Sequence, residues 1–286
     1  MNRRNINSIA GGKVLRTVIT LIAVLLTGGS ATAGVVVKGN VYGGGNLADV
    51  GGSVTVNMSA GTVEKDVYGG GALANTNVNN WDATKNEGTG GWADGMYNES
   101  TGKTTNTTTV SLTGGTIKGD AYGGGLGQKT GFNSATSDIE ATVWGDIAVN
   151  LGSSTSGSSA TAFYITNYTG DHADVVKSGR VFGCNNLLGS PQGNVTVTVY
   201  KTVAGNVTRT ASDKLKLTTT DAGYVTPTYE VAAVYGGGNL ADYTTTGKMP
   251  YVRIETCDVS IRDVYGGGNA AEVPGTDVLV RGAYEI

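Results

Sequence analysis

Six short glycine-rich segments are the first places in this sequence where chemistry would be sought. The stretch VYGGGNLAD occurs at residues 41–49 and returns letter for letter at 234–242. Four variants, which together with these two we call the glycine boxes, lie at 67–74, 121–126, 181–187 and 264–271. Glycine-rich loops bind phosphate through backbone amides, supply carbonyl ligands to calcium, or allow a tight turn. The residues that accompany the glycines decide among these uses.

Neither a nucleotide site nor a calcium repeat fits the boxes well. A dinucleotide fingerprint needs G-x-G-x-x-G between a strand and a helix, whereas counting from Gly43 ends on Ala48 with no helical pattern behind it. The Gly-Lys-Ser/Thr of a phosphate loop is absent. Calcium-binding repeats place aspartate sixth in the motif, and Asp49 and Asp242 come one position late. Both retain oxygen ligands suited to calcium, but the sequence favours solvent-exposed carboxylates at a turn, so no cofactor and no metal are expected.

Acid–base catalysis has one candidate cluster. Polysaccharide lyases and hydrolases use clustered carboxylates, with or without a basic partner, on one face. The densest such group is Arg253, Asp258, Arg262 and Asp263. The aspartate before Val-Tyr or Ala-Tyr recurs, however, as Asp66 and Asp120, so we interpret it as a structural residue. The only histidine, His172, lies in a polar segment and is expected to be a solvated loop residue. No catalytic residue is assigned.

An internal repeat positions all of these residues. The aromatic residues of the boxes are spaced by 26, 54, 60, 53 and 30 residues, which indicates a unit of about 26–30 residues lengthened by insertions. These aromatic residues are Tyr42, Tyr68, Tyr122, Phe182, Tyr235 and Tyr265. Alternating segments such as 54–58 and 110–112 are typical of strands, and residues 34–286 show no sustained helical period. Because so short a unit cannot bury its own apolar face, the predicted fold is all-β, a single-stranded parallel β-helix (a solenoid) with loop insertions.

Stacked units imply columns of like residues. Inward columns are expected from Val54 and Val56, Val110 and Leu112, Val195 and Val197, and Val252 and Ile254. The six aromatic residues should form a column beside them. The glycines are predicted to form corners, some with positive φ, where asparagine is the next most tolerant residue. Asn46, Asn185, Asn239 and Asn269 are candidates for a partial amide ladder, which Ala72 and Leu126 interrupt.

Residues 1–33 have the pattern of a secretory signal peptide. Four basic residues precede or overlap an apolar run, TVITLIAVLL at 17–26, and Ala-Thr-Ala ends at Ala33. A run of ten is short for a membrane span, which needs about 20 apolar residues, so no span is expected in residues 34–286. The protein is predicted to be exported to the cell surface or the extracellular space, with the periplasm as the alternative.

The charge of the exported part argues against nucleic-acid binding. The chain has 20 basic and 23 acidic side chains, and four of the basic ones lie in residues 1–33, so the remainder is acidic by seven charges. Phosphate contacts require clustered Lys and Arg. Cys184 and Cys257 are predicted to be free thiols, because about two turns of the proposed stack separate them, near 10 Å, and a disulfide needs Cα atoms within about 7 Å.

Insertions are expected at about 75–107, 126–145, 152–180 and 201–230. The first contains Trp81, Trp92 and Tyr97, whose ring faces suit sugar rings or partner proteins. The alternative, which we favour, is that these aromatic residues fix the loop onto the flank of the stack.

The boxes VYGGGNLAD, VFGCNNLLGSPQGNVTVTVYKT and VYGGGNAAEVPGTDV resemble those of large exported adhesin-like proteins of Gram-negative gut bacteria with V-[YF]-G-G-G-N repeats. Those proteins are similar in pattern to polymorphic outer-membrane proteins and autotransporter passengers, which are parallel β-helices. The resemblance covers essentially all of 34–286 and implies a surface or secreted role, with no catalytic residues to carry over.

Two functional hypotheses follow. The first is a non-enzymatic, adhesin-like scaffold that presents loops to glycans, matrix or other cells. The second is a carbohydrate-active β-helix enzyme, a lyase or hydrolase, or a binding module attached to one. Residues 276–286, TDVLVRGAYEI, read as the first half of a further unit without a polar cap. The sequence therefore predicts a chain that continues, or end-to-end self-association.

Overall fold

The computed structural model describes residues 34–78, 80–82, 87–89, 106–155, 158–167, 175–203, 229–255 and 259–281. The chain divides into two units, Met1–Gly34 and Val35–Ile286, and apart from Gly34 every described residue belongs to the second. The described residues form strands, turns and bends but no helix. They accordingly contain no helix of the length and apolarity needed to cross a membrane.

Two parallel sheets contain most of the strands. The eight-stranded sheet has the order β1-β3-β7-β9-β12-β14-β16, with β10 paired to β7. Its strands are β1 (Val36–Val37), β3 (Val54–Val63), β7 (Thr107–Ile117), β9 (Asp146–Leu151), β10 (Ala162–Phe163), β12 (Val195–Val199), β14 (Pro250–Ile254) and β16 (Asp277–Val280). The six-stranded sheet consists of β2 (Val41–Tyr42), β4 (Val67–Tyr68), β8 (Ala121–Tyr122), β11 (Arg180–Phe182), β13 (Val231–Tyr235) and β15 (Ile261–Tyr265).

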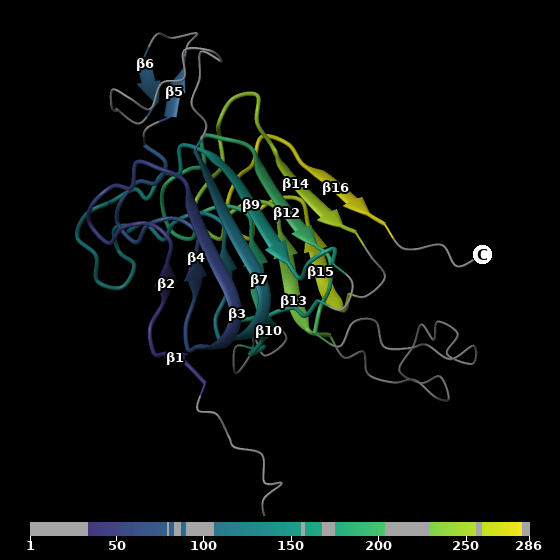
Figure 1. The fold of residues 1–286 in the computed structure, drawn as a ribbon. Coiled ribbons are helices and arrows are strands. Elements are labelled where there is room, and N and C mark those ends of the chain that lie inside the picture. Colours follow the sequence, from purple (N-terminus) through teal and green to yellow (C-terminus); the bar gives the residue numbers. More distant parts are fainter. Residues whose placement is uncertain are drawn as a thin grey trace, which may run out of the picture. The chain divides into compact units, whose positions relative to one another are not determined.

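The chain alternates between these sheets in sequence order. It places β3 in the larger sheet, β4 in the smaller, β7 in the larger and β8 in the smaller, and continues in this way to β16, except that β9 and β10 both lie in the larger sheet before β11 returns to the smaller (Figure 1). Within each sheet, neighbouring strands are parallel and come from successive visits of the chain. We call one strand of the larger sheet, the following strand of the smaller sheet and the chain joining them a pass. The prediction of an all-β fold with parallel strands is confirmed.

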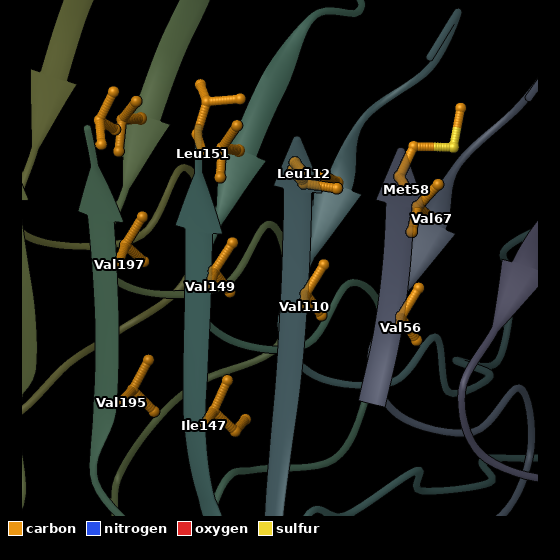
Figure 2. Packing of buried hydrophobic residues seen from close by; sticks show 14 of the residues in the cluster. Val56, Met58, Val67, Val110, Leu112, Ile147, Val149, Leu151, Val195 and Val197 are labelled. Carbon is orange, nitrogen blue, oxygen red and sulfur yellow. The ribbon is translucent and has the colours of Figure 1, made fainter. Parts of the chain in front are cut away.

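Alternation within the larger sheet builds the core. Val56, Val110, Val149, Val197 and Val252 are register partners on consecutive strands. The side chains of Val56, Val110, Val149 and Val197 point to the same side of the sheet, and those of Met58, Leu112 and Leu151 lie two residues further along the same strands (Figure 2). All eight residues that the sequence predicted to point inward are buried, with exposed fractions of 8% or less. Burial of each such side chain contributes about 1.5–3 kcal/mol.

The smaller sheet separates apolar and aromatic residues onto its two faces. Val67, Val181 and Val234 belong to the same buried cluster as the valines of the larger sheet. The residue after each of them, Tyr68, Phe182 or Tyr235, belongs to a separate aromatic cluster. Because side chains alternate along a strand, the box aromatics lie on the face turned away from the main core.

A third line of contacts joins each box to the next long strand. Isolated parallel bridges pair Val50 with Thr76, Thr76 with Val143, and Val143 with Pro191. Tyr243 lies in the next box-to-strand connection, is fully buried in the main core, and donates its hydroxyl hydrogen to the carbonyl oxygen of Gly193 at 2.8 Å. The sequence analysis did not single out Tyr243.

Parts of the expected insertions are described. In the first, β5 (Asn80–Asp82) and β6 (Glu87–Thr89) form an antiparallel pair. In the second, Gln128 and Ile139 form an antiparallel bridge that closes a short loop. Within 152–180, β10 returns to the larger sheet and pairs Ala162 with Thr116, which the composition of that segment did not indicate. Residues 204–228 of the fourth insertion lie outside the described residues.

Candidate functional site: the glycine boxes and the aromatic column

The first glycine of each box lies where a side chain has no room. A Cβ on Gly123 would overlap the carbonyl oxygen of Gly183 in the next pass and lie 2.5 Å from Ile147 and 2.7 Å from Val149. A Cβ on Gly69 would likewise overlap the carbonyl oxygen of Gly123 and the side chains of Thr108 and Val110. The box glycine therefore lets the smaller sheet approach the inward side chains of the larger one.

The expected reason for the glycines was wrong in one respect. None of the described box glycines has a φ in the left-handed region. Positive φ occurs instead at Gly61, Gly115 and Gly152, at or just beyond the bends of the long strands, where φ is 83°, 76° and 73°. The box glycines are required by the close approach of neighbouring passes, whereas these others are required by backbone conformation.

The box amides are already used between passes. The N–H groups of Gly69 and Gly70 donate to the carbonyl oxygens of Tyr122 and Gly124 at 2.9 and 3.0 Å. Gly123 donates in the same way to Phe182 at 2.9 Å, and Gly71 donates to Thr76 Oγ1 at 3.1 Å. A phosphate cradle needs amides that point at the ligand. The amides of Gly69, Gly70 and Gly123 bond to the next pass and that of Gly71 to a side chain five residues on, so the geometry is that of a packed corner.

The aromatic residues of the six boxes form one continuous stack, as expected from the sequence. Successive ring centroids are 4.7–4.9 Å apart, and successive ring planes differ by 4–11°. This spacing equals the separation of hydrogen-bonded strands, so the sheet sets the distance between rings. Tyr68, Tyr122 and Phe182 have exposed fractions of at most 1%. The middle of the column is closed to a ligand.

An amide ladder flanks the last boxes, with one correction to its membership. Asn269 donates its amide hydrogen to Asn239, and Asn239 donates to Asn186, each at 2.9 Å. Asn186 in turn donates to the Tyr68 hydroxyl at 2.7 Å. Asn185, which was expected in the ladder, instead donates to the carbonyl oxygen of Ala141 at 2.6 Å. The ladder position is the fourth residue after the aromatic, and in the fourth box that residue is Asn186.

A second polar column precedes the aromatic residues. Asn40 Oδ1 accepts the backbone N–H of Asp66 at 3.0 Å, and Asp66 Oδ1 accepts that of Asp120 at 2.9 Å. Asp120 Oδ1 accepts the backbone N–H of Arg180 at 2.8 Å. The recurring acid or amide therefore accepts a hydrogen bond from the next pass, in keeping with its interpretation as a structural residue.

Asp120 and Arg180 form the most buried ion pair among the described residues. Arg180 Nη2 is 2.6 Å from Asp120 Oδ2, with 12% and 6% of the two side chains exposed. The guanidinium also lies 5.2 Å from the centroid of the Phe182 ring. Burial raises the pKa of the Asp120 carboxyl, and the hydrogen bonds and charge of Arg180 oppose that rise. Nothing in the sequence pointed to this pair.

The acid–base cluster suggested by the sequence is split between the two sheets. Arg253, on β14 of the larger sheet, pairs with Asp277 at 3.0 Å. Arg262 and Asp263, on β15 of the smaller sheet, pair with each other at 2.7 Å. Asp258 lies outside the described residues. The described members therefore form two separate ion pairs.

The two calcium candidates also bind backbone of the next pass. Asp49 Oδ1 accepts the N–H of Asn75 at 2.8 Å, and Asp242 Oδ1 accepts that of Glu272 at 2.7 Å. In the described part of the chain, no three His, Cys, Asp or Glu side chains gather closely enough to hold a metal ion.

The remaining candidates are only partly placed. Trp81 lies in β5 opposite Gly88, while Trp92, Tyr97 and His172 lie outside the described residues.

The thiol of Cys184 is free and fully buried, and burial raises its pKa well above the ordinary value. Cys257 lies outside the described residues.

The outer face of the larger sheet is the polar surface that the sequence analysis did not single out. Two rows of side chains alternate with the buried columns and lie in register along β3, β7, β9 and β12. One row is Thr55, Thr109, Ala148 and Thr196, and the other is Asn57, Ser111, Asn150 and Thr198. Apart from Ala148 these residues carry hydroxyl or amide groups and no charge. All of them except Thr198, which is buried with 8% exposed, reach the surface and can donate and accept hydrogen bonds.

Comparisons with known proteins give this chain no relatives. No family model matches it, and neither the curated proteins nor the solved structures contain a match.

Proposed function

We propose that this chain is a single-stranded parallel β-helix that acts as an exported, non-enzymatic, adhesin-like scaffold. The observation that carries the proposal is the alternation of the chain between two parallel sheets, with an aromatic stack kept in step through six boxes. Such a stack gives a rigid support on which loops of different length are tolerated, because the strands of each pass pair only with those of the neighbouring passes.

A structural role also agrees with how the repeated polar residues are used. Asp66, Asp120 and Asp242 each accept a backbone hydrogen bond from the following pass. A general acid or base must reach a substrate proton, and these carboxylates face backbone instead. Glycine boxes, carboxylates and asparagines thus all serve the stacking of passes, which supports a scaffold over the enzyme hypothesis.

Two surfaces are the proposed contacts with glycans or surface proteins. The first insertion enters between Val78 and Asn106, directly before β7 of the larger sheet, and carries Trp81, Trp92 and Tyr97. The second is the outer face of that sheet, with its rows of hydroxyl and amide groups. Aromatic faces and neutral hydrogen-bonding groups are the chemistry that recognises sugars.

Export is tested by expressing the full chain in a Gram-negative host and separating the cell fractions. We expect the protein outside the cytoplasm with Gly34 as its first residue. A cytoplasmic protein that keeps Met1 would contradict the export proposal.

Binding is tested on a glycan array with the wild-type chain, Trp81→Ala and Trp92→Ala. Phe132→Ala is the control, because Phe132 is an exposed aromatic residue in a different loop, at 129–135. Signals that fall in the tryptophan variants and persist in the control support the loop surface. Release of new reducing ends from polysaccharides, abolished by Asp263→Asn or Asp258→Asn, would favour the enzyme hypothesis instead.

A further inference from the structure

Among the described residues, the two edges of the larger sheet present complementary halves of one long strand. At the first end, β1 covers only the second half of β3, since Val36 and Val37 pair with Thr62 and Val63. Among the described residues, no strand pairs with Val54–Met58 on that side. At the other end, the edge strand β16 is aligned with the first half of β3. Val278 is the register partner of Val252, which continues the column of Val197, Val149, Val110 and Val56.

Apolar surface is incompletely covered at both of these ends, and at the first end Val35 and Val36 are 76% and 47% exposed. A cavity of about 110 Å³ opens beside the uncovered half of β3 and is lined mainly by apolar side chains, among them Val35, Val56 and Met58. Val56 and Met58 are at the edge of the column in Figure 2. At the far end, Val278 and Val280 are 43% and 68% exposed, although their column partners Val252 and Ile254 are buried. Each end therefore presents the apolar groups and unpaired strand backbone that the other end lacks.

We propose that a second copy of this chain covers this end, with β16 of one copy pairing in parallel with Val54–Met58 of the next. The register is fixed by the columns: Val278 lies beside Val56 and Val280 beside Met58. Strand β16 of one copy and β1 of the next then form together the long strand that β3 and β7 each form alone. This inference extends the proposed scaffold function. It rests on the proposed function in one respect, because it requires the cleavage that leaves Gly34 as the first residue.

The polar and aromatic columns continue across the same junction. Tyr265 is 44% exposed at one end of the ring stack, and Tyr42 is the last ring at the other. Asn269 is the last asparagine of the amide ladder. In that ladder each asparagine donates its amide hydrogen to the one before it in the sequence. Asn46 of the next copy is its successor in that pattern, whereas within its own chain Ala72 occupies the neighbouring ladder position.

The contact joins two different surfaces, and each copy continues the stack of the previous one along the same axis instead of turning back on it. A head-to-tail contact repeated along one axis produces an open filament. Exposed parallel edges with matching columns of apolar residues are templates for this kind of growth. Isolated chains are therefore expected to form a concentration-dependent series of oligomers.

Sedimentation velocity of residues 34–286, purified after export with the N-terminus verified, tests the association. We expect the mean sedimentation coefficient to rise with protein concentration. Val280→Lys should weaken association by about tenfold or more, because it places a charge in an apolar contact, and because Val280 is already exposed each copy should still fold. Tyr164→Lys is the matched control, since Tyr164 is 59% exposed and directly follows β10, which pairs with β7 and not with an edge strand.

Cysteine trapping tests the register. In a Cys257→Ser background, a chain with Asn57→Cys is mixed with one with Leu279→Cys. These positions belong to one outward row of the larger sheet, so they would face each other across the junction with Cα atoms about 4.8 Å apart. Thr55→Cys with Leu279→Cys is the out-of-register control, displaced by two residues and beyond the usual reach of about 7 Å.

The outcomes separate this inference from the proposed function. Rapid disulfide formation by the matched pair alone, lost in Val280→Lys, supports the junction. A monomer at all concentrations, oligomers unaffected by Val280→Lys, or equal trapping of both cysteine pairs would overturn it. Failure of export or of glycan binding would instead count against the scaffold proposal, because those assays do not depend on association.

Discussion

The carboxylate of Asp120 holds Arg180, sixty positions later in the sequence, by backbone and side chain together. One oxygen accepts the Arg180 backbone N–H at 2.8 Å, while the other lies 2.6 Å from Nη2 of the guanidinium. The pair therefore fixes the position of β11 on β8 at the start of the box. It also covers the edge of the ring stack, since the guanidinium lies over Phe182.

Replacement of Asp120 by Asn is expected to destabilise the protein by about 3 kcal/mol, because it leaves a buried guanidinium without its counter-charge. The amide oxygen keeps an acceptor for the Arg180 N–H, as Asn40 does for Asp66, so the loss reports the charge. The measurement is the midpoint of urea unfolding followed by far-UV circular dichroism.

Lys118→Gln is the matched control for that experiment. It removes a 2.8 Å ion pair with Glu64 in which the two side chains are 42% and 26% exposed, and such solvent-exposed pairs contribute little to stability. Equal midpoints for the two variants would show that burial of the Asp120 pair is energetically unimportant.

Three glycine-to-alanine variants distinguish two requirements for glycine, lack of space for a Cβ and a positive φ. Gly123→Ala should cost about 3 kcal/mol or more, because its Cβ would overlap the backbone of the next pass. Gly247→Ala should cost about 1–2 kcal/mol, because φ is 72° but nothing lies within 4 Å of the added Cβ. Gly52→Ala, with neither restriction, should be neutral or stabilise by up to about 1 kcal/mol.

Thermal unfolding of the three proteins gives the order. If Gly123→Ala unfolds at the same temperature as Gly52→Ala, the close approach of neighbouring boxes is not a constraint on the sequence. If Gly247→Ala is the most damaging, backbone conformation outweighs space, contrary to the geometry described above.

The ring stack predicts that Tyr122→Phe and Tyr122→Ala differ in their effect on stability. Tyr122 stacks between Tyr68 and Phe182, with centroids at 4.9 and 4.8 Å. Tyr122→Phe should change stability by less than about 1 kcal/mol, because Phe182 shows that the column accepts a ring without a hydroxyl and the Tyr122 hydroxyl lies 3.4 Å from Asp120. Tyr122→Ala should cost about 3–5 kcal/mol, as large-to-small changes in a core do.

Urea unfolding of both variants, with near-UV circular dichroism as a second probe of ring packing, makes the comparison. A large loss in Tyr122→Phe would show that the hydroxyl, and with it the polar column, contributes more than the stack.

The sequence predicted what depends on local alternation. Val56 and Val110 point inward because period two along a strand decides which face is buried, and that pattern is visible in any one repeat. The spacing of the aromatic residues likewise identified Tyr122 and Phe182 as neighbours, even though 60 residues separate them. Both inferences need only the order of residues within a unit.

What the sequence could not supply depends on contacts between units. Some of the box glycines were expected to have positive φ, but none of those described has it, and their role is to leave room for the carbonyl oxygen of the next pass. Asn185 was expected in the ladder, but the number of residues after Phe182 sets the register and places Asn186 there instead. Arg180 was missed because insertions of unequal length hide which residue follows Asp120 in the stack.

The thiol of Cys184 offers a probe of the stack under native conditions. It is fully buried, with Sγ 3.5 Å from the carbonyl oxygen of Gly236 in the next pass. Burial raises the pKa of this thiol, and only the thiolate is nucleophilic. In a Cys257→Ser background, alkylation by iodoacetamide near pH 8 should therefore be far slower than that of a model thiol of pKa about 8.5, and urea should restore the ordinary rate. Raising the pH should accelerate native alkylation little, since access requires separation of the passes. A native rate equal to that of the model thiol would show that the boxes of β11 and β13 are not in contact.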